Sequence, residues 1–360
     1  MKRILLAGLL LTVSMGVTSG KGNKICELTK QEKTQLLNEA DDFIDELPDG
    51  LQDRQADAVL HAMQGAAFEL QEVRQSRDKS FTYSDNIKIT DICPIDGMAR
   101  GINMRLYQPK VNNDKLPLLI YLHGGGWTFG SLNSCAAFCD ALTSSGNIAV
   151  LAVDYSLAPE NPFPRGLSDC IAVVEYVFAN TDKLGTSPTL ISLGGDSSGG
   201  NLALATSIYM IGTQKSDKEL KSLILYYPVV NINNENTGSW RQYSRGYGLD
   251  RRLMDAFSSA YDDNGRSPEQ IGNISKDVLK SPLSAPEDIL AKLPPILMIA
   301  AERDILADQG KAFTEKVKKT GNSIERIEFP GSVHLFITVP GQPTAFNKAV
   351  ALTADFLNNF

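Results

Sequence analysis

From Leu116 onward, short apolar runs alternate with longer amphipathic ones, and this alternation restricts the fold more than any other feature of the sequence. The apolar runs predict strands at 116–122, 148–153, 189–193, 223–227, 296–300 and 324–328, with helices in most of the intervals. Strands that are apolar at nearly every residue are buried on both faces, as in a parallel sheet covered by helices. We therefore predict an α/β fold with functional residues just after the strands, because ligands bind at their carboxyl ends.

Three other segments lie outside this alternation. Residues 29–76 show helical periodicity broken at Pro48-Asp49-Gly50, which predicts two helices. Apolar runs at 87–95 and 102–108, separated by Asp96-Gly97, predict an antiparallel pair of strands. Residues 231–285 form a long polar insertion with one helical stretch near 249–261.

A candidate nucleophile follows the strand predicted at 189–193. The run Gly195-Asp196-Ser197-Ser198-Gly199 matches Gly-x-Ser-x-Gly and precedes a helical run at 202–211. In such a strand-turn-helix context the glycines at 195 and 199 let strand and helix approach closely, and the sharp turn exposes the Ser197 hydroxyl. Ser197 is favoured over Ser198, because only Ser197 has a glycine two positions away on both sides. A glycine-rich turn without a function is the alternative, and the context argues against it.

A second glycine-rich loop, His123-Gly124-Gly125-Gly126-Trp127, follows the strand predicted at 116–122. Backbone without side chains leaves amide N–H groups able to point at an anion. We expect Gly124, Gly125 and Gly126, with the N–H of Ser198, to form an oxyanion hole. A phosphate-binding loop is the alternative, but the lysine and the serine or threonine of a nucleotide loop are missing.

A serine hydroxyl becomes a strong nucleophile only when a neighbouring base takes its proton. The chain has three histidines. His61 lies in an N-terminal helical run, and His123 belongs to the glycine loop, where we expect it to fix the loop geometry. His334 follows the last predicted strand and therefore reaches the same edge of the sheet as Ser197. We predict that His334 is the general base, rather than a solvated loop histidine.

The predicted base needs an acidic partner that fixes its tautomer. Asp304 comes shortly after the strand predicted at 296–300, and the chain order Ser, Asp, His is that of one known hydrolase class. Glu302 and Asp308 are rivals. We favour Asp304, because Glu302 is still close to the strand and Asp308 falls in the next helical run.

The first residues have the pattern of a secretory signal peptide. Met1-Lys2-Arg3 is followed by an apolar run at 4–13 and by small residues at 17–19, so we predict a signal peptide over residues 1–19. A retained anchor is the alternative, but the run is shorter than the roughly 20 residues of a spanning helix, and no later segment approaches that length. We expect an exported protein, either periplasmic or secreted.

The five cysteines do not form a disulfide framework. Cys135 and Cys139 would lie one turn apart on a helix, which is poor disulfide geometry, and Cys170 falls in an apolar helical pattern. We expect these three to be buried as small hydrophobic residues. Cys26 and Cys93 are the one pair worth testing for a disulfide bond.

Charge and composition exclude several classes of partner. The net charge of −7 and the absence of basic runs give no footprint for nucleic acid or for an anionic membrane surface, so an uncharged or small ligand is favoured. No cysteine or histidine spacing indicates a metal site. The proposed chemistry requires no cofactor.

With these motifs in place, the sequence resembles the hormone-sensitive-lipase-like esterases, a bacterial family of the α/β-hydrolase superfamily. The resemblance runs from about Leu116 to the C-terminus. It is carried by 123–127, by the run 154–164 (DYSLAPENPFP), by 195–201, by Ser281-Pro282-Leu283, and by Asp304 and His334.

The resemblance implies one catalytic domain over residues 20–360. It implies a mostly parallel eight-stranded sheet with helices on both faces, and a helical cap formed by about 29–76 and 231–285. It also implies hydrolysis of short- to medium-chain acyl esters, with Gly125 and Gly126 as the oxyanion donors of the loop. This chain departs from the family in having Ser198 where alanine is usual, Ser156 where arginine is usual and Asn161 where histidine is common.

Two rival functions remain at this stage. The three catalytic residues alone do not distinguish ester from amide or peptide cleavage, although nothing indicates a peptide-binding subdomain. The same fold also serves as a ligand receptor when the triad is broken, as in the gibberellin receptors, but His334 is present here. The physiological ester and the oligomeric state depend on surface shape, which the sequence does not give.

Overall fold

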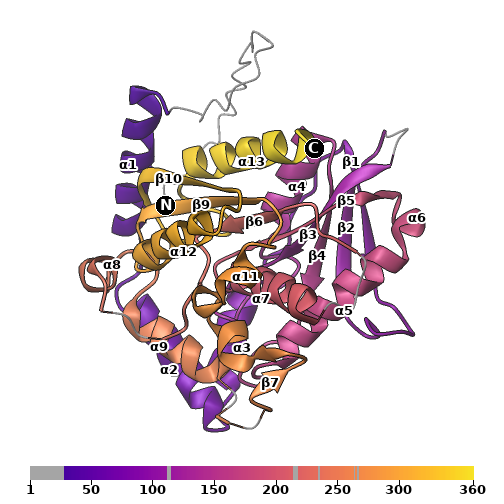
Figure 1. Ribbon diagram of the computed structural model, residues 1–360. Helices are drawn as coiled ribbons and strands as arrows, with labels where there is room; N and C mark the ends of the chain where they lie inside the picture. The colour runs from indigo at the N-terminus through magenta and orange to yellow at the C-terminus, as the bar shows by residue number, and fades with distance from the viewer. Residues whose placement is uncertain (1–27, 112–114, 214–217, 234–235, 263, 266) are drawn as a thin grey trace.

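An eight-stranded sheet forms the centre of the protein (Figure 1). The computed structural model describes residues 28–111, 115–213, 218–233, 236–262, 264–265 and 267–360. The strand order is β1-β2-β4-β3-β5-β6-β9-β10. Neighbouring strands from β4 to β10 are parallel, and β2 runs antiparallel to both β1 and β4. The strands are β1 (Ile87–Ile92), β2 (Asn103–Pro109), β3 (Leu116–Leu122), β4 (Ala149–Asp154), β5 (Thr186–Asp196), β6 (Leu223–Tyr226), β9 (Ile296–Arg303) and β10 (Ile324–Val333).

The strands predicted from the sequence are all present, and the antiparallel pairing of β1 with β2 is confirmed. Their bounds differ where the apolar run and the hydrogen-bonded ladder differ. β5 continues through Gly194 and Gly195, which pair with β6 although they carry no apolar side chain. β1 ends at Ile92, three residues before the end of its apolar run.

Alternate residues of the central strands contact different layers of helices. Leu118, Ile120 and Leu122 of β3 join an apolar cluster on one face, and Leu119 and Tyr121 join a cluster on the other. This alternation follows from the two-residue repeat of a strand. The first face is covered by α5 (Arg165–Ala179), α7 (Ser198–Thr213) and α12 (Ala307–Lys319), and the second by α4 (Ala136–Gly146) and α13 (Pro343–Asn358). The four-residue helix α6 (Thr181–Leu184) leads into β5.

Three helices precede β1, and the prediction of two was wrong. They are α1 (Lys30–Asp45), α2 (Leu51–Met63) and α3 (Phe68–Arg77). The second break follows Gln64, where Gly65 takes a left-handed φ of +95° that most residues avoid. α1 packs against β10 and α13, while α2 packs against α3 and against α9 (Arg251–Tyr261) (Figure 1).

The insertion at 231–285 holds more structure than the single helical stretch expected. That stretch is α9, but α8 (Gly238–Gln242) and α10 (Lys276–Lys280) are also helical. Helices of five residues are too short to show a periodic pattern. A hairpin of β7 (Gln270–Ile271) and β8 (Ile274–Ser275), a 3₁₀ turn (Pro282–Ser284) and α11 (Glu287–Leu290) complete the connection to β9.

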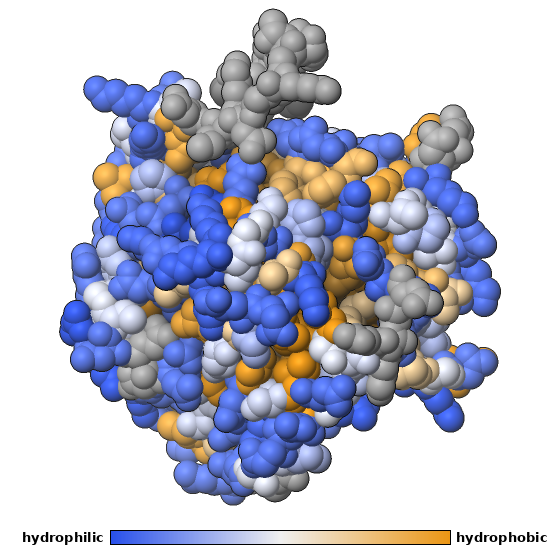
Figure 2. All heavy atoms as spheres, in the orientation of Figure 1, coloured by the Kyte–Doolittle hydropathy of each residue, from blue (hydrophilic) through white to orange (hydrophobic). Residues whose placement is uncertain are grey.

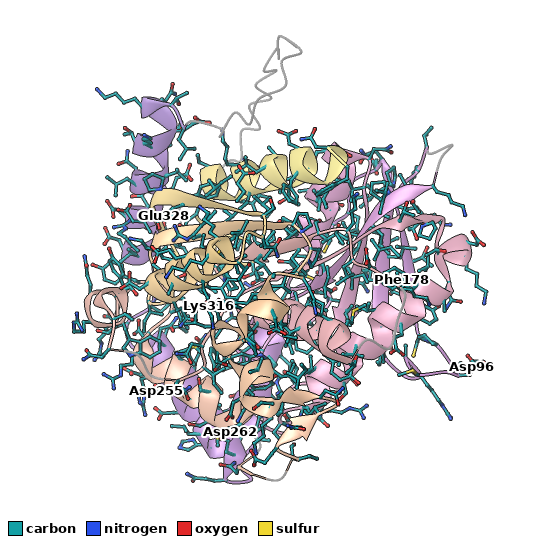
Figure 3. All side chains as sticks on the ribbon, in the orientation of Figure 1. Asp96, Phe178, Asp255, Asp262, Lys316 and Glu328 are labelled. Atoms are coloured by element: carbon teal, nitrogen blue, oxygen red, sulfur yellow. The ribbon has the colours of Figure 1, made fainter. Side chains whose placement is uncertain are left out.

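Apolar residues of α9 face inward, and its charged residues face solvent. Leu253, Phe257 and Tyr261 are buried. Asp255, labelled in Figure 3, pairs with Arg251 on the same helix. Hydrophilic side chains likewise predominate on the face shown in Figure 2, with apolar ones exposed in patches between them.

Cys135, Cys139 and Cys170 are buried and not disulfide-bonded, which confirms the expectation for these three. Burial raises the pKa of the Cys139 and Cys170 thiols. Cys93 is exposed, and Cys26 lies outside the described residues, so their pairing stays a prediction.

The predicted signal peptide also lies outside the described residues. Among the helices that are described, none is long and apolar enough to cross a membrane. In the same part of the chain, no group of three or more histidine, cysteine, aspartate and glutamate side chains is arranged to hold a metal ion.

Candidate active site

Ser197 occupies a strained turn between β5 and α7. β5 ends at Asp196 and α7 begins at Ser198, and Ser197 between them has a left-handed φ of +54°. Its N–H donates to the carbonyl of Tyr226 at 2.9 Å, and its own carbonyl accepts from the N–H groups of Asn201 and Val229, each at 3.1 Å. A serine held in this rare backbone region by three backbone hydrogen bonds is typical of a nucleophile elbow.

The glycines around Ser197 are required by close packing. A Cβ atom added at Gly199 would collide with the carbonyl oxygen of Leu122 at the end of β3, and one at Gly195 would meet the same atom. The close approach of strand and helix was predicted from the Gly-x-Ser-x-Gly spacing, and the structure adds that the end of β3 packs against both.

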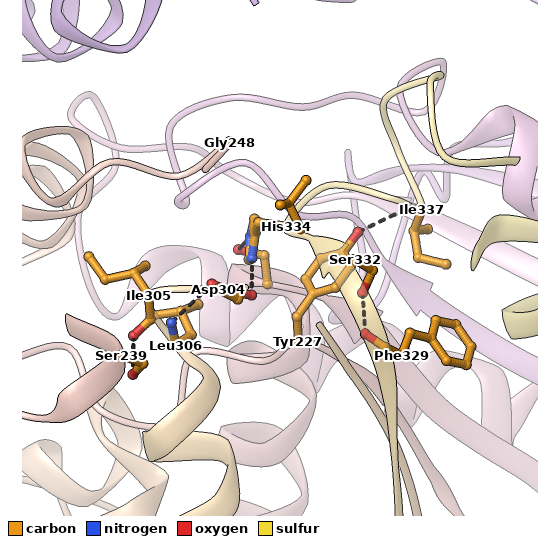
Figure 4. A network of polar contacts seen from close by, with 12 residues as sticks. Tyr227, Ser239, Gly248, Asp304, Ile305, Leu306, Phe329, Ser332, His334 and Ile337 are labelled. Atoms are coloured by element: carbon orange, nitrogen blue, oxygen red, sulfur yellow. Dashed lines mark hydrogen bonds and ion pairs between the residues drawn. The ribbon is translucent and has the colours of Figure 1, made fainter. Parts of the chain in front are cut away.

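Three predicted residues from different segments meet in one hydrogen-bonded chain. His334 Nε2 lies 3.1 Å from Ser197 Oγ. On the other side of the ring, His334 Nδ1 lies 2.6 Å from Asp304 Oδ2 (Figure 4). The exposed fractions are 6% for Ser197 and 1% for both Asp304 and His334. The carboxylate can only accept, so Nδ1 carries the proton and the Nε2 lone pair faces the serine hydroxyl.

Further contacts fix the orientation of Asp304 and His334. The N–H of Leu306 donates to Asp304 Oδ1 at 2.9 Å, so both carboxylate oxygens are bound. The ring of Tyr227 packs against the His334 ring with centroids 4.3 Å apart. Tyr227 is itself held in place, because its hydroxyl accepts from the N–H of Ile337 at 3.0 Å (Figure 4).

Gln342 holds the segment that carries His334. Its Oε1 accepts from the N–H of Val333 at 3.0 Å, and its Nε2 donates to the carbonyls of Val333 and His334, both at 3.3 Å. The side chain is buried at the start of α13. Neither Tyr227 nor Gln342 was identified from the sequence, since no motif distinguishes them.

The two rival acids are engaged elsewhere. Glu302 accepts from the N–H of Gly331 at 2.6 Å, and Asp308 accepts from the N–H of Ser239 at 2.8 Å. Asp304 is therefore the carboxylate that the fold brings to His334.

The glycine loop after β3 presents two backbone donors beside the turn at Ser197. Gly125 and Gly126 have left-handed φ angles of +122° and +60°, and the carbonyl of Gly125 accepts from the N–H of Phe129 at 2.8 Å. Within the described residues, the N–H groups of Gly125, Gly126 and Ser198 have no acceptor. Unengaged donors of this kind can bind an anion.

The expectation that Gly124 also supplies such a donor was wrong. Its N–H donates to Asp196 Oδ1 at 2.9 Å, and the same oxygen accepts from the hydroxyl of Tyr121 at 2.7 Å. Burial raises the pKa of Asp196, and these two hydrogen bonds oppose that rise. Asp196 thus holds the first glycine of the loop in place.

His123 is buried at the start of the loop. Its Nδ1 donates to the carbonyl of Gly124 at 3.0 Å, and its ring stacks on Tyr155 with centroids 4.4 Å apart. The hydroxyl of Tyr155 donates to the carbonyl of His123 at 2.6 Å. Burial lowers the pKa of His123. Its contacts are those of a residue that fixes the loop.

Helix α9 covers the glycine loop. A Cβ atom at Gly126 would collide with the ring of Phe257, and Trp127 stacks on Tyr261 with centroids 4.3 Å apart and planes 7° apart. Phe257 also meets the ring of Phe129 edge-on at 5.1 Å. The insertion therefore packs directly on the loop that carries the backbone donors.

Comparison with known proteins gives the family. Residues 119–338 match a family described as having the alpha/beta hydrolase fold. The chain belongs to this α/β-hydrolase family. This membership confirms the resemblance inferred from the motifs, and the eight-stranded, mostly parallel sheet confirms the predicted fold class.

Several relatives of this α/β-hydrolase have been named as esterases. A carboxylesterase (NlhH) from Mycobacterium tuberculosis is 30% identical over 260 residues, 71% of this chain and 78% of the relative. An arylesterase from Saccharolobus solfataricus is 30% identical over 279 residues, 76% and 86% of the two chains. The structure of an esterase from Pyrobaculum calidifontis is similar with a TM-score of 0.71 and 30% identity, covering 81% of this chain and 92% of that one.

Proposed function

We propose that this α/β-hydrolase is a serine carboxylesterase that cleaves short- to medium-chain acyl esters through an acyl-enzyme intermediate. The observation that carries the proposal is the buried chain of hydrogen bonds from Ser197 through His334 to Asp304. The esterase names of its relatives support the same reaction class.

In the first half of the reaction, Ser197 Oγ attacks the ester carbonyl carbon while His334 Nε2 takes the hydroxyl proton. The electron pair of the carbonyl moves to its oxygen, and that oxyanion accepts from the N–H groups of Gly125, Gly126 and Ser198. Asp304 stabilises the imidazolium that forms. When the intermediate collapses, the alcohol leaves with the proton from His334.

Water repeats these steps on the acyl-enzyme. His334 takes a proton from the water as its oxygen attacks the acyl carbon, and the same N–H groups bind the second oxyanion. Ser197 then leaves, regains its proton from His334, and the carboxylic acid is released. Atoms and charges balance with ester and water as the only substrates.

The cap supports a preference for small acyl groups. Phe257 and Tyr261 pack against Gly126 and Trp127, so the space beside the backbone donors is bordered by rigid aromatic rings. A short acyl chain fits beside such a wall with fewer rearrangements than a long one.

The test is hydrolysis of p-nitrophenyl esters from acetate to laurate by the purified protein. We expect turnover to be highest at short chains and to fall by about a millionfold in kcat in Ser197→Ala, the loss known for removal of such a nucleophile. Ser198→Ala, which keeps its backbone N–H, should retain most of the activity. A folded wild type no faster than Ser197→Ala on every ester would exclude the proposal and direct the search to amides or a bound ligand.

We also propose that residues 1–19 direct export, because they combine a basic start, an apolar run and small residues. Expression of the full chain followed by fractionation of periplasm, medium and cytoplasm tests this. Export should be lost when residues 1–19 are deleted, and retention of the deleted form outside the cytoplasm would contradict it.

A further inference from the structure

Arg77, the last residue of α3, lies next to the loop that carries the backbone donors. Its guanidinium carbon is 5.3 Å from the centroid of the Phe129 ring, in cation–π geometry. Phe129 in turn closes the turn at Gly125 and touches Phe257, whose ring covers Gly126. A single aromatic ring therefore separates Arg77 from the oxyanion loop.

The guanidinium of Arg77 makes no hydrogen bond or ion pair with any residue in the described part of the chain. The residue is half-buried, and burial lowers its pKa. An arginine nevertheless stays charged at neutral pH. The Phe129 ring faces the charge but accepts no hydrogen bond and carries no counter-charge, so a partly dehydrated guanidinium still gains free energy when an anion binds it.

Arg74, one helical turn before Arg77, has a clear structural role. Arg74 donates to the carbonyls of Thr128 and Ala158 at 2.8 and 2.9 Å, and to both carboxylate oxygens of Glu160 at 2.7 and 2.9 Å. Its hydrogen bonds tie α3 to the loops after β3 and β4. Arg77 makes none of these hydrogen bonds, and its contact with the loop after β3 is through the face of the Phe129 ring, which leaves the N–H donors of the guanidinium free for a ligand.

The carboxylate of Asp196 does not neutralise Arg77. Asp196 raises the pKa of Arg77 electrostatically, so the two groups sense each other's charge. However, Asp196 Oδ1 already accepts from Tyr121 and Gly124, and its carboxylate forms no ion pair with Arg77. The positive charge of Arg77 therefore remains available next to the loop that carries the backbone donors.

We propose that Arg77 is a specificity-determining residue that binds a carboxylate carried by the ester substrate. The proposal rests on the esterase function proposed above and deepens it. The planar guanidinium fork matches a carboxylate in a two-bond geometry. The site offers one positive charge, that of Arg77, and the protein as a whole has a net charge of −7, which repels polyanions. A ligand with a single negative charge is therefore favoured.

The experiment compares two matched pairs of esters. On the acyl side, the p-nitrophenyl monoester of adipate is paired with its neutral methyl diester, and on the alcohol side para-acetoxybenzoate is paired with its methyl ester. We expect the wild type to favour the anionic member of at least one pair in kcat/KM by about tenfold to a hundredfold, the usual strength of charged hydrogen bonds. The pair that shows the preference tells which side of the ester lies over Arg77.

The variants separate direct contact from general electrostatics. Arg77→Gln should abolish the preference and leave the neutral esters within roughly twofold of wild type. Arg77→Lys keeps the positive charge but loses the planar guanidinium group, so it should retain part of the preference for anionic esters. Lys79→Gln removes the same charge from an exposed neighbouring position and should change nothing. The proposal is overturned if the wild type shows no preference, if the preference survives Arg77→Gln, or if Arg77→Gln slows neutral and anionic esters equally.

A binding measurement keeps the two proposals distinct. In the Ser197→Ala background, the uncleaved anionic ester should raise the midpoint of thermal unfolding more than its neutral partner, and Arg77→Gln should remove that difference. An anion-specific shift without wild-type turnover on any ester would uphold the carboxylate site and reject the esterase function. Turnover without anion selectivity in rate or binding would uphold the esterase function and reject the carboxylate site.

Discussion

The hydroxyl of Tyr121 donates a 2.7 Å hydrogen bond to Oδ1 of Asp196, and this contact links the middle of the sheet to the turn at Ser197. The same carboxylate oxygen accepts from the N–H of Gly124. The aspartate that precedes the nucleophile in sequence thus acts on the opposite side of the site, by holding the glycine loop at its first residue.

Replacement of Asp196 by alanine should displace the glycine loop. We expect kcat for p-nitrophenyl butyrate to fall by about tenfold to a hundredfold, because the N–H groups of Gly125 and Gly126 would move relative to the oxyanion. Asp196→Asn keeps an oxygen that can accept from both donors and should retain most of the activity. Equal losses in the two variants would show that the charge of Asp196 matters and not its role as an acceptor.

Asp304→Asn should lower kcat by roughly a thousandfold to ten-thousandfold, as in other triads in which the acid is replaced by its amide. An amide N–H facing His334 Nδ1 favours the tautomer that places a proton on Nε2, where the lone pair is required. Steady-state kinetics on one ester measure this. Asp308→Asn is the matched control, since Asp308 binds Ser239, and a similar loss in that variant would argue against Asp304.

Gln342→Ala should reduce kcat by about tenfold while leaving KM within a few-fold. The glutamine joins the backbone of Val333 and His334 through three hydrogen bonds, so its loss loosens the base without touching bound substrate. Comparison of kcat and KM on a short ester checks the prediction. A rise in KM at constant kcat would instead assign Gln342 to substrate binding.

His123 should make the protein less stable as the pH falls below the ordinary histidine pKa of about 6.5. Burial lowers the pKa of His123 in the folded state, so below that pH the unfolded chain binds a proton that the folded chain does not. The free energy of unfolding, measured by urea titration from pH 8 to 5, should therefore fall more steeply for wild type than for His123→Phe.

Asp196 contributes with the opposite sign, because its pKa is raised in the folded state and protonation there favours folding. His123 itself opposes the rise in the pKa of Asp196, so the difference between wild type and His123→Phe combines the loss of the His123 contribution with the change at Asp196. Parallel curves for the two proteins would contradict the role assigned to His123.

Residues that follow strands could be placed from the sequence alone. Ser197, Asp304 and His334 lie far apart along the chain, but parallel strands end at one edge of the sheet, so position relative to a strand predicted their meeting. The Gly-x-Ser-x-Gly spacing predicted the close approach of strand and helix at Ser197, whereas the contact of Gly199 with Leu122 of β3 came from the structure.

The hydrogen-bond partners of individual groups could not be predicted from the sequence. The sequence does not tell that the N–H of Gly124 is engaged by Asp196 while those of Gly125 and Gly126 are not. It likewise does not distinguish Arg74, with four hydrogen bonds, from Arg77, with none in the described residues. Both are arginines one turn apart on a short helix, and only the tertiary structure separates them.

The three helices before β1 include a segment that is held at both ends. α1 packs beside β10 at one edge of the sheet and β1 forms the opposite edge, so residues 46–86 connect the two edges on the side where α9 lies (Figure 1). The segment is thus held at both of its ends, and within it Gly65, with its left-handed φ, separates α2 from α3. The position of Arg77, at the end of α3, therefore depends on how the chain is fastened at two distant edges of the sheet.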